Sequence, residues 1–231
     1  MLPIAFIVGW MLLILFVGSA LVRRQRRKAD AGIRQLAASL GFSILENMEA
    51  VDRSIVPAMR RAALEAREKL PPYFRKLAER PAKGFLCAAG TADGVEVTIF
   101  LEASGSGKSN TRYTVVRADY PKPLPFEMRI GSEGAFTRLG KALFELRDLE
   151  IGDAEFDRAV RVKTADEAGA RAAVGKPGVR DAVLGLLALS TSAFATNAYA
   201  QWVEQGCRFD PAKTRERVAA VVAVARTLGG D

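Results

Sequence analysis

The chain opens with an uncharged apolar segment, residues 1–22, that is followed at once by basic residues. A helix rises about 1.5 Å per residue, so a segment of this length reaches about 33 Å, enough to cross a hydrocarbon core of about 30 Å. The pattern predicts a transmembrane helix over residues 1–22. A cleaved signal peptide is the alternative, because Gly18-Ser19-Ala20 resembles a cleavage site, but a signal peptide carries its positive charge before the apolar core.

The basic residues after the apolar segment form a juxtamembrane cluster: Arg23, Arg24, Arg26, Arg27 and Lys28. Excess Lys and Arg stay on the cytoplasmic side of a membrane, so this cluster predicts the topology. We expect a single-pass protein of the bacterial inner (cytoplasmic) membrane, with its N-terminus outside and its C-terminal domain in the cytoplasm. Anionic lipid headgroups are a further expected partner, since each basic residue near such a surface contributes about 1 kcal/mol.

Two amphipathic patterns predict helices in the next part of the chain. Apolar residues share one stripe over residues 29–40, and Gly41 follows as a C-terminal stop. A similar spacing recurs over residues 51–70, until Pro71-Pro72 ends it. These patterns assign residues 29–80 to a helical segment.

The middle of the chain changes to the alternation that is typical of strands. Four segments with β-rich or alternating patterns are 85–89, 95–101, 112–118 and 126–130. The second and third predict an antiparallel pair, and the four together predict a meander. A later strand is predicted over residues 156–163, with Phe156, Val160 and Val162 on one face.

The C-terminal third predicts an apolar helix over residues 179–189 and short strands within residues 190–203. Residues 182–203 carry no charge, so a second membrane span is the alternative, but the hydroxyl and amide side chains there are costly in lipid. A buried core segment is therefore favoured. The last helix is marked by Asp210 as N-cap, Pro211 in the first turn and Gly229-Gly230 as the stop, and we expect it to pack on the sheet.

These elements predict an α+β fold, in which an N-terminal transmembrane helix is followed by a cytosolic domain with an antiparallel β-meander packed against helices. The predicted domains are a transmembrane helix over 1–22, a basic juxtamembrane cluster over 23–28, a helical segment over 29–80 and an α+β domain over 81–231.

The amino-acid composition limits the kinds of functional site that the chain can contain. The chain has no histidine, which excludes every triad and metal site that depends on imidazole. Its cysteines, Cys87 and Cys207, are far apart and are expected to be reduced and buried. The net charge is +8, and without the five juxtamembrane cations it is 8 − 5 = +3. Because no basic stripe with interleaved aromatics is evident, we expect no nucleic-acid partner.

Two motifs invite a chemical interpretation. Residues 105–109, Gly-Ser-Gly-Lys-Ser, resemble the end of a phosphate-binding loop, but Glu102 replaces the first glycine and a strand is predicted to follow, which favours a hairpin loop. Asp153, Glu155 and Asp157 suggest a hard-cation or acid/base site, but their spacing fits no known calcium loop. We therefore assign no catalytic, cofactor-binding or metal residue, and we expect no cofactor.

The segment from Glu150 to Lys163 resembles a known sequence motif. Its Leu-Glu-Ile-Gly-Asp-Ala-Glu-Phe-Asp-Arg sequence at 149–158, followed by Val-Arg-Val-Lys and an Ala-rich stretch, resembles a motif of bacterial membrane-anchored domains of unknown function. The resemblance implies an α+β domain over residues 85–228 behind apolar N-terminal helices, and it implies no activity. Asp153 and Asp157 are motif positions, which it implies to be hydrogen-bonding residues at a turn and a strand start.

The sequence thus favours a single-pass membrane protein whose cytosolic α+β domain acts as a binding or assembly module for a protein partner, rather than an enzyme. The alternative is a membrane-tethered enzyme or ligand-binding domain that acts on a phosphorylated or lipid-linked small molecule. In that case Lys108, Ser109 and nearby arginines would be the anion ligands.

Overall fold

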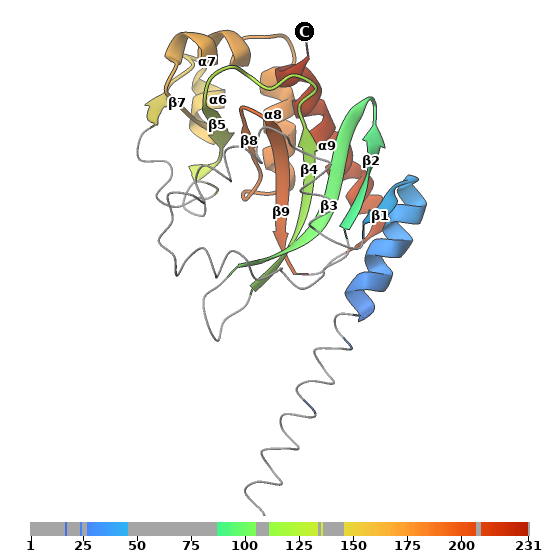
Figure 1. Ribbon diagram of the computed structural model, residues 1–231. Helices are drawn as coiled ribbons and strands as arrows, with labels where there is room; N and C mark the ends of the chain where they lie inside the picture. The colour runs from blue at the N-terminus through green and yellow to red at the C-terminus, as the bar shows by residue number, and fades with distance from the viewer. Residues whose placement is uncertain are drawn as a thin grey trace, which may run out of the picture.

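The computed structural model of the chain describes residues 17, 24, 27–45, 87–104, 111–133, 135, 146–206 and 209–230. The strands of these residues form one nine-stranded sheet in the order β1-β2-β3-β4-β9-β8-β5-β7-β6 (Figure 1). Every pairing in the sheet is antiparallel. The strands are β1 Ser43–Leu45, β2 Cys87–Ala92, β3 Val95–Ser104, β4 Thr111–Asp119, β5 Met128–Gly131, β6 Arg147–Leu149, β7 Arg161–Thr164, β8 Phe194–Thr196 and β9 Tyr199–Gln205.

The described helices contribute to one large core cluster with one face of this sheet. They are a helix over residues 27–40, drawn in blue in Figure 1, and α6 Ala154–Ala159, α7 Glu167–Val174, α8 Val179–Leu189 and α9 Pro211–Gly229. An antiparallel sheet with one face covered by helices is an α+β architecture, so the α+β part of the predicted fold class is confirmed.

Alternate residues of the strands divide between the two faces of the sheet. On β4, Val116 and Ala118 belong to the large cluster that includes α9 residues, whereas Val115 belongs to a smaller cluster on the opposite face. That second cluster also holds Phe194 and Val203. Both faces of the central strands therefore bury apolar side chains.

The predicted hairpin is confirmed, because β3 and β4 pair from Val97 opposite Ala118 to Ser104 opposite Thr111. The predicted meander is right only for β2, β3 and β4. The strand predicted near residue 126 is β5, but β9 and β8 lie between it and β4. The segment after β4 crosses the β8–β9 turn instead, where Tyr120 N donates to Ala198 O at 2.8 Å and Leu124 N donates to Asn197 O at 2.7 Å.

The strand predicted over residues 156–163 is wrong in its first half. Residues 154–159 form α6, and only Arg161–Thr164 is a strand. The spacing misled the prediction because Phe156 and Val160 are both buried and lie four residues apart, which suits a helix as well as a strand. A helix this short shows too little periodicity for the two to be told apart.

The uncharged stretch 182–203 is a core segment, as the sequence favoured: it runs through α8, β8 and most of β9. The last helix is also confirmed. Asp210 caps it by accepting from Ala212 N and Lys213 N, and Pro211 is its first residue. The apolar side of α9 packs on β3, β4 and β9.

The predicted transmembrane helix lies, apart from Val17, outside the described residues, and so do the predicted helix at 51–70 and Cys207. No helix among the residues that are described has the length and apolar character needed to cross a membrane.

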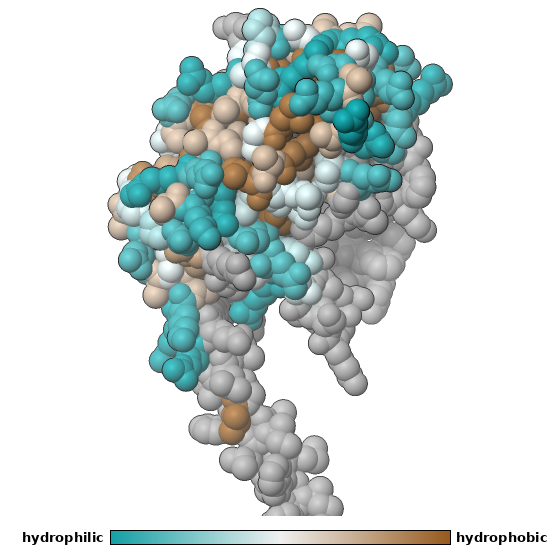
Figure 2. All heavy atoms as spheres, turned by 180° about the vertical axis from the view of Figure 1, so that it is seen from behind, coloured by the Kyte–Doolittle hydropathy of each residue, from teal (hydrophilic) through white to brown (hydrophobic). Residues whose placement is uncertain are grey.

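Val17 is 47% exposed, and Cys87 is buried. Figure 2, seen from behind, shows apolar side chains gathered in a band between hydrophilic ones.

Candidate functional site: the basic entry helix

The helix over residues 27–40, called the entry helix below, is part of the domain core. Its buried residues are Ala29, Ile33, Leu36 and Ala37, and the side chains of Ile33 and Leu36 are 0% exposed. These four share one side of the helix, at the i, i+4, i+7 and i+8 spacing of an amphipathic stripe. The same core contains residues of the sheet and of α9, so the entry helix packs within it.

Two contacts align the entry helix with α9. A Cβ on Gly32 would lie 2.6 Å from Phe209 Cδ2, so only glycine allows the helix to approach this ring so closely. Further along, Arg215 Nη2 donates to Ser39 O at 3.1 Å. Because residue 32 meets residue 209 and residue 39 meets residue 215, the two helices run in the same direction.

The entry helix ends in a Schellman motif that leads into the sheet. Gly41 adopts φ +70°, which glycine tolerates best, and Phe42 N donates to Ala37 O at 2.8 Å. β1 follows directly and pairs with β2. The predicted glycine stop is therefore confirmed, and both ends of this segment are fixed to the domain.

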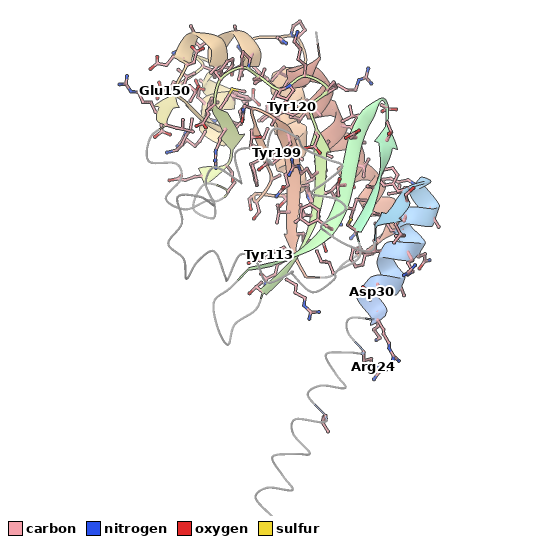
Figure 3. The ribbon with its side chains drawn as sticks, in the orientation of Figure 1. Arg24, Asp30, Tyr113, Tyr120, Glu150 and Tyr199 are labelled. Carbon is pink, nitrogen blue, oxygen red and sulfur yellow. The ribbon has the colours of Figure 1, made fainter. Side chains whose placement is uncertain are left out.

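Two of the predicted juxtamembrane cations, Arg27 and Lys28, are the first residues of this helix. Arg24, Arg27 and Lys28 are helical and exposed, whereas Arg23 and Arg26 lie outside the described residues. Figure 3 shows Arg24 and Asp30 at the end of the entry helix that is farther from Tyr120 and Tyr199. Only six residues separate Val22 from Ala29, the first residue that is described as buried, so the apolar segment and the core are about 10 Å apart along a helix and at most about 25 Å apart along extended chain.

A partly buried cation lies where α9 meets β9. The guanidinium of Arg217 lies 3.8 Å from the centroid of the Trp202 ring, and its Nη2 donates to Glu204 Oε2 at 2.8 Å. Burial lowers the pKa of Arg217, although Glu204 acts in the opposite direction. Trp202 Nε1 donates to Leu189 O at 3.4 Å, so the cluster also ties the end of α8 to the sheet.

A second cation lies on the opposite face of the sheet. Arg117 lies 3.9 Å from the centroid of the Tyr199 ring and donates to Asp119 Oδ1 through Nε at 2.9 Å and Nη2 at 2.7 Å. Burial raises the pKa of Asp119, and Glu96 adds to this, while Arg117 opposes it. Asp119 Oδ2 is buried without a hydrogen-bond partner.

The carboxylates of the 150–163 motif have structural roles. Asp153 caps α6 by accepting from Glu155 N and Phe156 N, and it pairs with Arg180 on α8 at 2.8 Å. The backbone N–H of Phe156 is the main cause of its lowered pKa. Asp157 accepts from the backbone N–H groups of Ile151, Gly152 and Asp153. The expectation that Asp153 and Asp157 bond at this turn is met, but α6 begins there instead of a strand.

The structure also bears on the two chemical motifs. Residues 105–110, with Lys108 and Ser109, lie outside the described residues, but the strand β4 follows them where a phosphate-binding loop needs a helix. The described residues contain no group of three or more Asp, Glu, Cys or His side chains that could hold a metal ion. The site that the sequence and structure share is therefore the basic start of the entry helix.

The Arg217 and Arg117 clusters were missed by the sequence reasoning. Arg217 stands three residues after Thr214 and four before Val221, both buried, so a cation within the apolar stripe of α9 was the available signal. Arg117 likewise interrupts the apolar run of β4. The sequence around each arginine does not predict which aromatic ring it contacts, because Trp202 and Tyr199 are both on β9, whereas Arg217 is on α9 and Arg117 is on β4.

The described residues thus define an α+β protein with a nine-stranded antiparallel sheet, one face of which is packed with helices. The fold is similar to the crystal structure of the mycobacterial trehalose monomycolate transport factor A, TtfA, with a TM-score of 0.51 and 14% sequence identity. The match covers 87% of this chain and 95% of that chain, and at this identity it concerns the fold alone. No protein-family model and no curated protein matches the chain.

Proposed function

We propose that this chain is a single-pass membrane protein whose α+β domain is a noncatalytic binding or assembly module at the cytoplasmic face of the membrane. The observation that carries the proposal is the burial of the entry helix. Ala29 is 4% exposed and Ile33 is 0% exposed, only a few residues after the apolar segment. A membrane helix over residues 1–22 would then be joined to the domain without a long flexible linker.

Such a joint has a functional consequence. A domain on a long flexible tether samples many orientations, whereas a domain whose first helix is packed in its own core a few residues after the membrane segment samples fewer of them. Preorganisation of this kind lowers the entropy cost of binding a partner that is itself in the membrane. A domain with a restricted orientation at the membrane is therefore suited to an assembly function. Transport of the kind named for TtfA is one process in which such a module would work.

The first test is crosslinking of the full-length, C-terminally tagged protein in its native membrane, followed by purification and identification of what accompanies it. We expect a reproducible stoichiometric protein partner. Recovery of the protein alone would contradict the assembly role and shift weight to a small-ligand or enzymatic role.

A matched pair of variants tests the rigid joint. Twenty Gly and Ser residues inserted between Lys28 and Ala29 keep both the apolar segment and the core, but they release the domain from a fixed orientation. The control carries the same insertion between Asp231 and the tag. We expect partner recovery to fall only when the insertion precedes Ala29, and equal recovery from both variants would show that orientation is irrelevant.

A further inference from the structure

We propose that Arg24, Arg27 and Lys28 form a binding surface for anionic lipid headgroups. This inference rests on the proposed membrane tether, and it names a lipid partner for the entry helix. It is carried by three observations: the face of the helix on which these cations lie, the position of the nearest acidic side chain, and their distance from the apolar segment.

The helical residue Arg24 and the first two residues of the entry helix, Arg27 and Lys28, share one face at helical spacing. Their positions follow the i, i+3 and i+4 spacing that brings helical side chains together. All three are exposed, whereas the residues at 29, 33, 36 and 37 are buried against the domain. At 100° per residue, the cations centre almost opposite this buried stripe, so they point away from the domain that the helix holds.

Within the described part of the domain, no acidic side chain neutralises these cations. No ion pair to any of the three is recorded among the described residues. The nearest acidic residue in the helix is Asp30, but its Oδ1 is buried, which places that oxygen toward the domain. The outer face at the start of the entry helix therefore carries a concentrated positive charge that no described acidic residue pairs with.

The position of these residues favours a lipid over a soluble anion. Arg24 is two residues and Lys28 six residues after Val22, or about 3 and 9 Å along a helix. These distances are comparable with the Debye length of about 8 Å at physiological ionic strength, so the charges act on a headgroup layer beside the apolar segment. Guanidinium groups also bind phosphate oxygens in a bidentate manner, which suits phosphodiester headgroups.

The test uses the full chain purified in a neutral detergent and titrated with short-chain lipids by native mass spectrometry. The probes are dioctanoyl phosphatidylglycerol, dioctanoyl phosphatidylcholine and glycerol phosphate. We expect selective binding of phosphatidylglycerol that weakens with added salt. The variant R24Q/R27Q/K28Q should bind it on the order of 100-fold more weakly, because each basic residue near an anionic surface contributes several-fold.

The matched control is R158Q/K213Q/R226Q, which removes the same charge from exposed positions on α6 and α9. The charge-retaining variant R24K/R27K should still bind phosphatidylglycerol selectively, but more weakly because it loses the bidentate guanidinium contacts, and thermal unfolding checks that all variants are folded. Equal affinity of the triple variant and its control, binding of phosphatidylcholine to the same extent, or binding of glycerol phosphate alone would each overturn the proposal. Partner recovery in the native membrane is a separate readout, so failure of the assembly role is distinguishable from failure of lipid binding.

Discussion

The guanidinium of Arg217, on α9, lies 3.8 Å from the centroid of the Trp202 ring on β9 and donates from Nη2 to Glu204 Oε2 at 2.8 Å. The side chain of Arg217 is 11% exposed and that of Glu204 is 30% exposed. The two partners are therefore unequally hydrated. Removal of Glu204 therefore leaves a mostly buried cation, whereas removal of Arg217 leaves a carboxylate that water can reach.

This inequality predicts an asymmetric response to mutation. Glu204→Ala leaves a mostly buried cation without its carboxylate, and we expect the free energy of unfolding to fall by about 2 kcal/mol. Arg217→Met fills the same space with an apolar side chain and leaves a carboxylate that water reaches, so the loss should stay below about 1 kcal/mol. Urea unfolding of both variants measures the difference, and the reverse order would refute this account of the cluster.

The entry helix should contribute to the stability of the whole domain. Ile33→Ala removes a side chain that is 0% exposed, and such truncations lower the free energy of unfolding by about 2–5 kcal/mol. Gln35→Ala, at an exposed position of the same helix, serves as the control and should change it by less than about 0.5 kcal/mol. Chemical denaturation of the full chain provides the comparison. Indistinguishable values would mean that the helix is only loosely attached.

Two glycines in helices should respond oppositely to alanine. Gly32→Ala places a Cβ 2.6 Å from Phe209 Cδ2, and this overpacking should destabilise the protein by about 1–3 kcal/mol. A Cβ on Gly185 would meet nothing within 4 Å, so Gly185→Ala should stabilise α8 by up to about 1 kcal/mol through helix propensity. Thermal unfolding of both variants reports the signs. Stabilisation by Gly32→Ala would show that Phe209 moves aside at no cost.

Asp119 should make stability depend on pH in the acidic range. Burial raises its pKa above the ordinary value of 3.8, so the folded state binds the proton more tightly than the unfolded chain does. The resulting contribution is fully present below the unfolded pKa and is lost as pH rises through the folded pKa. Asp119→Asn keeps an oxygen that accepts from Arg117, and it removes this titration.

We therefore expect the stability difference between Asp119→Asn and the native chain to increase in favour of the variant as pH rises from about 3.5 toward neutrality. Urea unfolding at a series of pH values measures this difference. Asp181→Asn, at an exposed position in the first turn of α8, is the matched control for the loss of one carboxylate charge. A constant difference for Asp119→Asn would mean that the pKa of this carboxyl is not raised by folding.

The sequence predicted those elements whose periodicity and capping residues lie within the element itself. The β3–β4 hairpin follows from alternation of period two, and α9 follows from Asp210, Pro211 and a long apolar stripe. The entry helix was also evident, because its apolar stripe ends at Gly41. In each case the residues that specify the element are near one another in the chain. The short helix α6 lacked such a signal, since its buried Phe156 and Val160 fit both periods.

By itself, the sequence determined the α+β class, the boundaries of the longer elements, and the apolar and basic segments from which we infer a tether. Only the tertiary structure decided that β9 and β8 lie between β4 and β5, that Arg217 meets Trp202, and that the entry helix packs beside Phe209 and Arg215. The physical reason is the same for all three. Periodicity and capping show which face of an element is apolar. Which other element covers that face depends on shape and on the packing of the whole core. For the entry helix, the contacting residues are more than 160 positions away in the chain.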